Sequence, residues 1–141
     1  MHPLKLAGLS ALGFALGLAN VSAQADVVVV VSAKSTVTKL SQIQVAEIFL
    51  GKTARFPSGI HAVPIDQGEG TSVRDEFYAK FASKSAAQLK AHWSKIIFTG
   101  RGQPPKAAAS GAETRKRVAA DPNAIGYLER DTADSSVRIV L

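Results

Sequence analysis

The sequence predicts an α/β fold: a mainly parallel sheet flanked by helices. Three observations lead to this prediction. Residues 27–31 are five consecutive valines, which is typical of a strand buried on both faces. Downstream, strand-like segments alternate with segments of helical periodicity. Between one such strand and the next helix lies a glycine-rich turn, residues 66–72, with the sequence DQGEGTS.

The first 25 residues have the pattern of a secretory signal peptide. Lys5 precedes an apolar run at 6–18, and small residues at positions 23 and 25 form a cleavage site after Ala25. The apolar run is too short to span a bilayer comfortably, since a membrane helix needs roughly 20 apolar residues. We therefore expect an exported protein of the periplasm.

Residues 26–141 are expected to form a single domain, because their length suits one hydrophobic core. The chain contains no cysteine, so neither disulfides nor thiolate chemistry is available to it. Its formal net charge is +6, and the basic residues are scattered along the sequence. The charge favours anionic partners without indicating which ones.

The first half of this domain begins with the valine strand, for which a central parallel position is expected. Ser41 and Gln44 form a capping box at the start of a helix expected over about 42–50, and Gly51 lies where that helix would stop. After a turn, residues 60–65 alternate in polarity as a second strand would.

The second half begins with a helix over 72–81, which the apolar spacing of Val73, Phe77 and Phe81 predicts. A third helix starts at Ser85, with Gln88 completing another capping box, and runs to about residue 99.

The rest of the chain is expected to contain two loops, one short basic helix and two strands. By composition, residues 99–105 and 107–112 are loops, and 112–120 form the helix. Residues 124–128 and 137–141 are strand-like.

The glycine-rich turn has two interpretations. A helix N-terminus presents unpaired N–H groups and the positive end of a dipole, so Gly70, Thr71, Ser72 and Arg74 could hold an oxyanion. Alternatively, the glycines supply turn dihedrals and Thr71 caps the helix. Spacing alone does not distinguish an anion cradle from a turn.

An ordered set of motifs across residues 26–141 resembles the substrate-binding proteins of phosphate ABC importers. A further segment, residues 95–105, resembles short single-lobed relatives in the same superfamily. The resemblance implies a fold like one lobe of a type II periplasmic binding protein. The motifs are Leu40-Ser41, Gln44-Val45, Ile48-Phe49, Gly51-Lys52, Val63-Pro64, Gly68-x-Gly70-Thr71-x-x-Arg74-x-x-Phe77 and Ile125-Gly126-Tyr127.

The resemblance also implies that amides and hydroxyls around Gly70, Thr71 and Ser72 hold phosphate. Glu69 stands where full-length phosphate binders carry serine, and it either accepts a phosphate proton or is a solvated turn residue. Arg101, in the later glycine-containing loop, either contacts the anion or keeps that loop solvated.

Two functions follow from these expectations. The first is a periplasmic module that binds phosphate or a similar oxyanion for uptake or sensing, with a membrane transporter as partner. The second is a ligand-free accessory protein of the cell envelope that keeps the lobe fold. A single lobe leaves half of a ligand in water, so weak binding, a homodimer that supplies the missing wall, and loss of binding are three alternatives.

Other chemistry finds little support in the sequence. His61 and His92 lack neighbouring carboxylates at metal-ligand spacing, so no metal is expected, and no cofactor motif is present. No serine, histidine and aspartate form a recognisable triad, which argues against an enzyme. Residues 115–117 are a basic run, but few aromatics accompany it, so nucleic-acid binding is not expected.

Overall fold

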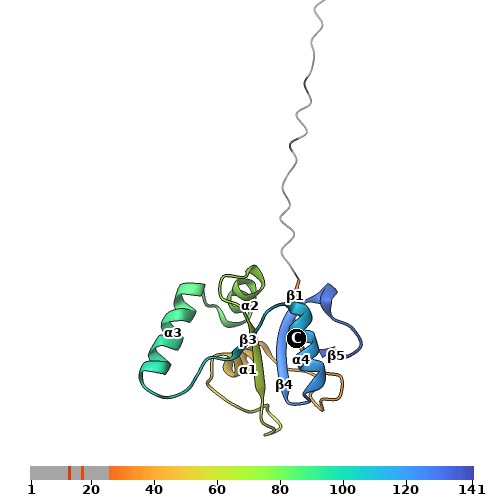
Figure 1. Cartoon of the computed structure of the whole chain (residues 1–141), viewed down its shortest axis with the longest axis horizontal. Coiled ribbons are helices and arrows are strands. Elements are labelled where there is room, and N and C mark those ends of the chain that lie inside the picture. Colours follow the sequence, from red (N-terminus) through yellow and green to blue (C-terminus); the bar gives the residue numbers. More distant parts are fainter. Residues whose placement is uncertain (1–12, 14–16, 18–25) are drawn as a thin grey trace, which may run out of the picture.

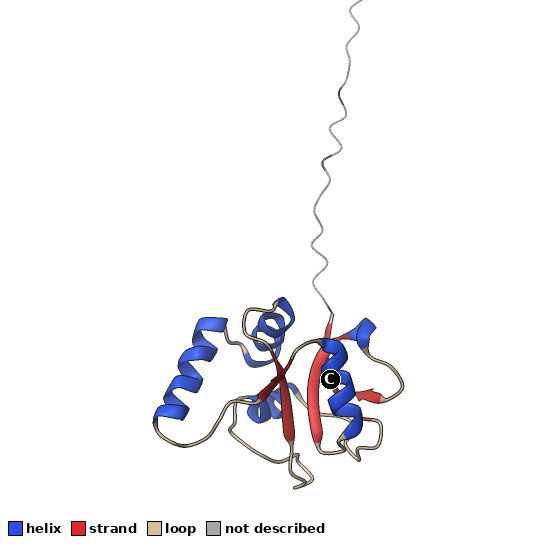
Figure 2. Cartoon of the chain, in the orientation of Figure 1, coloured by secondary structure: helices blue, strands red, loops and turns tan. Residues whose placement is uncertain are grey.

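The computed structural model describes Gly13, Gly17 and residues 26–141. Apart from those two glycines, the expected signal peptide lies outside the described residues. The described domain is a five-stranded sheet with helices on both faces, as Figures 1 and 2 show. The predicted α/β class is confirmed.

The sheet is mixed, with the strand order β3-β2-β4-β1-β5. The second strand runs parallel to both of its neighbours, β3 and β4. The first strand runs antiparallel to both of its own, β4 and β5. The bounds are β1 Val27–Ser32, β2 Val63–Gln67, β3 Lys106–Ala108, β4 Ala124–Glu129 and β5 Val137–Ile139.

The valine strand is buried as predicted, since no valine of β1 is more than 2% exposed. The prediction that it pairs in parallel is wrong, because both of its neighbours run the other way. Burial on both faces selects apolar β-branched residues whatever the direction of the neighbouring strands. The composition of β1 therefore indicates that the strand is buried. Its direction relative to its neighbours is set by the long connections that lead to β4 and β5.

Helices cover the sheet unequally (Figure 1). Helix α4 packs on one face, and α1 and α2 lie on the other. The capping boxes predicted at Ser41 with Gln44 and at Ser85 with Gln88 are both formed. The bounds are α1 Gln42–Phe49, α2 Ser72–Ala82, α3 Ala86–Phe98 and α4 Gly111–Ala120, and a short 3-10 helix, η1, covers Arg130–Thr132.

The prediction of a loop over residues 107–112 is wrong for residues 107 and 108. Residues of this segment form β3, in which Lys106 and Ala108 pair with Ile65 and Gln67 of β2. Alanine has little intrinsic preference for strands, so the pairing with β2 overrides the local preference. The edge strand is only three residues long, and it leaves the first half of β2 without a neighbour on that side.

The core has two parts, one on each face of the sheet. On the α1 and α2 face, aromatic rings pack together, and the rings of Phe77 and Tyr127 stack with centroids 3.9 Å apart. Phe49 meets both of these rings edge-on. Stacked and edge-on aromatic pairs each contribute about 0.5–1.5 kcal/mol beyond their area burial. This cluster fixes α2 against β4.

Helix α3 projects from the body of the domain (Figure 2). It is anchored by Leu89 and Trp93, which are buried, while Phe98 at its end is 92% exposed. The Trp93 ring lies against Gly51, where an added Cβ would come within 2.8 Å of it. No helix in residues 26–141 has the length and apolar character needed to cross a membrane.

Gly126 allows α4 to pack closely on β4, and this gives a first prediction. A Cβ at this position would lie 2.8 Å from Thr114 Cγ2 and 3.0 Å from Val118 Cγ2. We expect Gly126→Ala to lower the free energy of unfolding by about 1–3 kcal/mol, because the helix must shift. Urea denaturation measures it. The control is Gly102→Ala, whose Cβ would meet only an ordinary contact at 3.6 Å; equal effects of the two substitutions would contradict the prediction.

Candidate functional site

The glycine-rich turn joins β2 to α2, as predicted. The strand ends at Gln67 and the helix begins at Ser72. Gly70 has φ +86°, a conformation that suits glycine and strains other residues. Glu69, Gly70, Thr71 and Ser72 are all exposed, so the turn is open to solvent.

The start of α2 has free N–H groups. Thr71 occupies the N-cap position, but its hydroxyl donates to Gly68 O at 2.8 Å and makes no capping bond. The interpretation in which Thr71 caps the helix is therefore right about the position of Thr71 and wrong about a side-chain capping bond. The N–H groups of Ser72, Val73 and Arg74 donate to no atom within residues 26–141. These donors, together with the positive end of the helix dipole, can bind an anion.

Arg74 is directed beneath the turn. Its Nε lies 3.6 Å from Asp66 Oδ1, and its guanidinium carbon lies 5.3 Å from the centre of the Tyr78 ring. The Arg74 side chain is only 14% exposed. Its charge is thus largely paired with that of Asp66, next to the start of α2.

Asp66 is the centre of a buried hydrogen-bond network. It is 3% exposed, and it lies at the carboxyl end of β2. Tyr78 Oη donates to its Oδ2 at 2.7 Å, and Tyr127 Oη donates to its Oδ1. The N–H of Gln67 also donates to Oδ1, at 2.8 Å. Three donors and one cation thus compensate for burying this carboxylate.

Burial and the nearby Asp66 charge change the acidity of both tyrosines. Burial is the larger cause, and the negative charge of Asp66 is the second, so the pKa of Tyr78 and that of Tyr127 are raised far above the ordinary value. Both hydroxyls are therefore protonated at neutral pH and serve as donors to Asp66.

Gln67 links the end of β2 to β4 through its side chain. Its Nε2 donates to Tyr127 O at 2.8 Å, and its backbone N–H lies 3.0 Å from Tyr127 Oη. Because Gln67 is the last residue of β2, these bonds fix the point at which the chain leaves the sheet.

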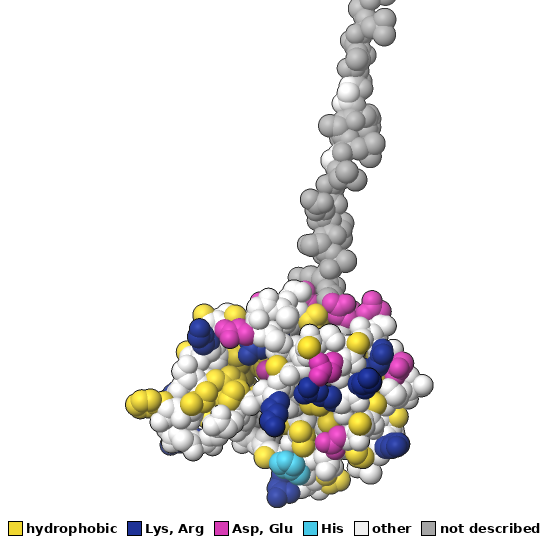
Figure 3. All heavy atoms as spheres, in the orientation of Figure 1, with side chains coloured by type: hydrophobic (Ala, Val, Ile, Leu, Met, Phe, Trp, Pro, Cys, Tyr) yellow, Lys and Arg dark blue, Asp and Glu magenta, His cyan; other side chains and the backbone are white. Residues whose placement is uncertain are grey.

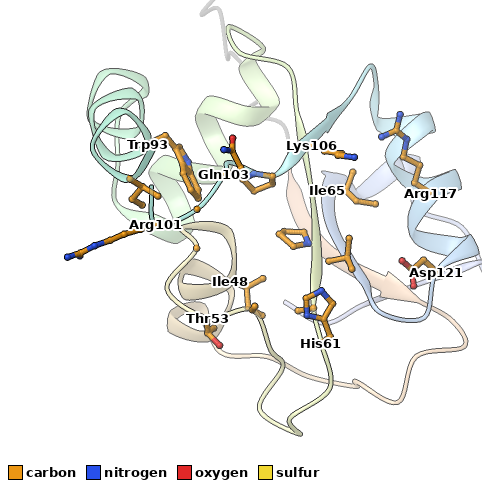
Figure 4. A pocket seen from close by; sticks show the side chains of 18 of the residues that line it. Ile48, Thr53, His61, Ile65, Trp93, Arg101, Gln103, Lys106, Arg117 and Asp121 are labelled. Atoms are coloured by element: carbon orange, nitrogen blue, oxygen red, sulfur yellow. The ribbon is translucent and has the colours of Figure 1, made fainter. Parts of the chain in front are cut away.

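The other predicted site residues lie apart from this network. Glu69 lies in the turn itself and is exposed. Arg101 follows α3, and Figure 4 shows its side chain pointing away from the neighbouring cleft. No bond joins Arg101 to the start of α2 among the hydrogen bonds and ion pairs of residues 26–141. On the face shown in Figure 3, basic side chains gather near α4 with acidic ones among them.

Sequence reasoning missed Asp66, Tyr78 and Tyr127 as a unit. One signal was present, because Asp66 is a charged residue that directly follows the apolar residues 62–65. The partners are 12 and 61 residues away along the chain. Only the fold brings them together. Within the part of the chain that the structure describes, no three histidine, cysteine or acidic side chains cluster in a way that could hold a metal ion.

Several solved structures that share this fold are described as phosphate-binding or phosphate-transport proteins. A phosphate ABC transporter substrate-binding protein from Clostridium perfringens, with bound phosphate, matches at a TM-score of 0.64 and 19% identity over 82% of this chain and 44% of its own. An ABC-type phosphate transport receptor from Vibrio cholerae matches at a TM-score of 0.65 and 15% identity, over 82% of this chain and 45% of its own. PstS from Borrelia burgdorferi matches at a TM-score of 0.54 and 11% identity, over 82% of this chain and 46% of its own.

These matches define the class of fold. The domain has the fold of one part of a periplasmic substrate-binding protein, and it spans less than half the length of each of these structures. No family model matches the sequence, and no curated protein matches it.

The tyrosines give a second prediction, on pH. The chain has two tyrosines, Tyr78 and Tyr127, and both have a raised pKa. Above about pH 10 the unfolded chain releases two protons that the folded chain keeps, so stability is fully present below that pH and falls as the pH rises. We expect absorbance of tyrosinate at about 295 nm to rise only together with alkaline unfolding followed by circular dichroism. Ionisation of either tyrosine before unfolding would contradict this.

Asp66 gives a third prediction. We expect Asp66→Asn to lower the free energy of unfolding by about 2–4 kcal/mol, because the amide can accept fewer of the donated bonds and leaves Arg74 without its counter-charge. Urea denaturation measures the loss. The exposed Asp75→Asn on α2 is the matched control, with an expected change below about 0.5 kcal/mol. A near-neutral Asp66→Asn would show that the network does not support the fold.

Proposed function

We propose that this protein binds phosphate or a similar oxyanion at the start of α2. The observation that supports it is the set of free N–H groups at Ser72, Val73 and Arg74, from which an anion would accept hydrogen bonds. Gly70, Thr71 and Ser72 surround the anion in this proposal, and the hydroxyl of Ser72 adds a donor. The bound phosphate in the structure from Clostridium perfringens supports the choice of ligand.

Electrostatics divide the remaining roles. Arg74 strengthens the positive potential from below while its Nε stays near Asp66. Glu69 is the exposed carboxylate of the turn, and we propose that it accepts a proton from the bound phosphate, which would favour phosphate over fully ionised sulfate. In this proposal Arg101 contacts the anion only if its loop moves.

The setting of this activity is also part of the proposal. We propose that residues 1–25 direct export and are cleaved after Ala25, which leaves the domain in the periplasm. There it would act as a binding protein rather than an enzyme, handing its anion to a membrane transporter or reporting its level. The transport proteins that share the fold support this setting.

A proline substitution tests the role of the free N–H groups and is our fourth prediction. Ser72 is the first residue of α2, where proline is well tolerated, and Thr71 before it has the extended conformation that proline requires (φ −78°, ψ 142°). Ser72→Pro thus removes one donor and keeps the helix. We expect phosphate affinity, measured by isothermal titration at low salt, to fall about tenfold or more, with the unfolding free energy changed by less than about 1 kcal/mol.

Two controls separate this effect from others. Ser72→Ala keeps the N–H group and removes only the hydroxyl, so its loss of phosphate affinity is expected to be smaller than that of Ser72→Pro. Ala86→Pro makes the same change at the first position of α3 and is expected to leave phosphate binding unaltered. If phosphate at up to about 50 mM gives no saturable heat with the unaltered protein, the proposal fails, and the ligand-free accessory role becomes the better description.

A further inference from the structure

A second concave site lies at the edge of the sheet, where β3 is too short to cover β2. Figure 4 shows this cleft beside β2, with Trp93 of α3 on one side and, on the other, Arg117 of α4 and Asp121, which follows that helix. Its volume is about 740 Å³, within the range of about 300–1,000 Å³ that small-molecule sites occupy. No residue of the turn before α2 lines it.

The floor of the cleft is apolar. Ile65 of β2 and Trp93 and Ile96 of α3 line it, as do Val63 and Pro64. Val63 is 36% exposed whereas Ile65 and Trp93 are almost fully buried, so this apolar surface meets solvent mainly at Val63. Covering it with an apolar group would gain roughly 25 cal/mol for each Å² removed from water.

An added β-strand does not suit this edge. The N–H of Ala62 donates to Ala54 O, the N–H of Val63 donates to Asn123 O, and Pro64 has none. The exposed edge of β2 therefore offers no free N–H over residues 62–64, and strand addition depends on such groups. The occupant has to contact side chains instead.

Charge decides the class of occupant. Lys106 borders the cleft and forms no ion pair among residues 26–141. In Figure 4 its side chain lies on the side of the cleft that faces α4. Arg117 is paired with Glu113 at 2.5 Å, and Asp121 is the only acidic residue of the lining.

We propose that the cleft binds an organic anion with an apolar body, in which a ring or hydrocarbon chain covers Val63, Ile65 and Ile96 while one carboxylate, sulfonate or phosphate group meets Lys106. The size, the apolar floor and the unpaired Lys106 support this together. The site is separate from the turn at α2 and does not depend on phosphate binding there.

The test uses an intrinsic reporter. Trp93 is the only tryptophan of the chain and lines the cleft. We expect anilinonaphthalene sulfonate, an apolar-bodied anion, to quench Trp93 emission saturably through energy transfer, at low salt and with or without phosphate. Lys106→Ala should raise its Kd about three- to fivefold and leave binding of the uncharged analogue N-phenyl-1-naphthylamine unchanged. Ala120→Phe should fill the cleft and weaken the binding of both probes more than tenfold.

Matched variants on α4 serve as controls. Lys116→Ala removes an exposed cation outside the cleft, and Ala112→Phe adds a ring outside it, so both should bind the dye as the unaltered protein does. Circular dichroism checks that each variant folds. Equal effects of Lys106→Ala and Lys116→Ala, or unchanged binding in Ala120→Phe, would overturn the proposal. So would dimerisation that excludes the dye, since it would assign the cleft to a second copy.

Discussion

The buried carboxylate of Asp66 is the interaction on which the arrangement of the domain depends. It joins three elements, because β2 carries it, Tyr78 of α2 donates to it and Tyr127 of β4 donates to it. A buried ionised group is costly unless its acceptor sites are filled. The position of α2 relative to the sheet is therefore set by the need to keep these donors in place. The stacked ring of Phe77 adds an apolar constraint to the same position.

This constraint has a consequence for the turn above it. Because Asp66 and Gln67 are fixed to β4, the chain leaves the sheet at a defined point and reaches α2 within a few residues. Thr71 completes the turn by bonding back to Gly68, and the first N–H groups of the helix are left free. A rigid base below and unused donors above are the features that a preorganised binding site requires.

The sequence predicted those features that local chemistry controls. The valines of β1 indicated burial, and the capping boxes at Ser41 and Ser85 marked helix starts correctly. It could not predict the direction of β1, because the long connections set it. Nor could it predict β3, whose alanines form a strand only because β2 offers a partner. The Asp66 network was hidden for the same reason: its donors are distant in the sequence.

The exposure of the turn limits how strongly a lone lobe could hold an anion. Hydrogen bonds to a charged group contribute about 1.5–3 kcal/mol each, and association costs at least about 4 kcal/mol. A millimolar Kd corresponds to about 4.1 kcal/mol, so three amides leave little beyond millimolar affinity. Gly70 and Ser72 are open to water, which weakens the bonds further. Tighter binding would need a second wall over the turn, from another copy or from a partner, and that wall would have to meet the exposed Glu69 without adding negative charge.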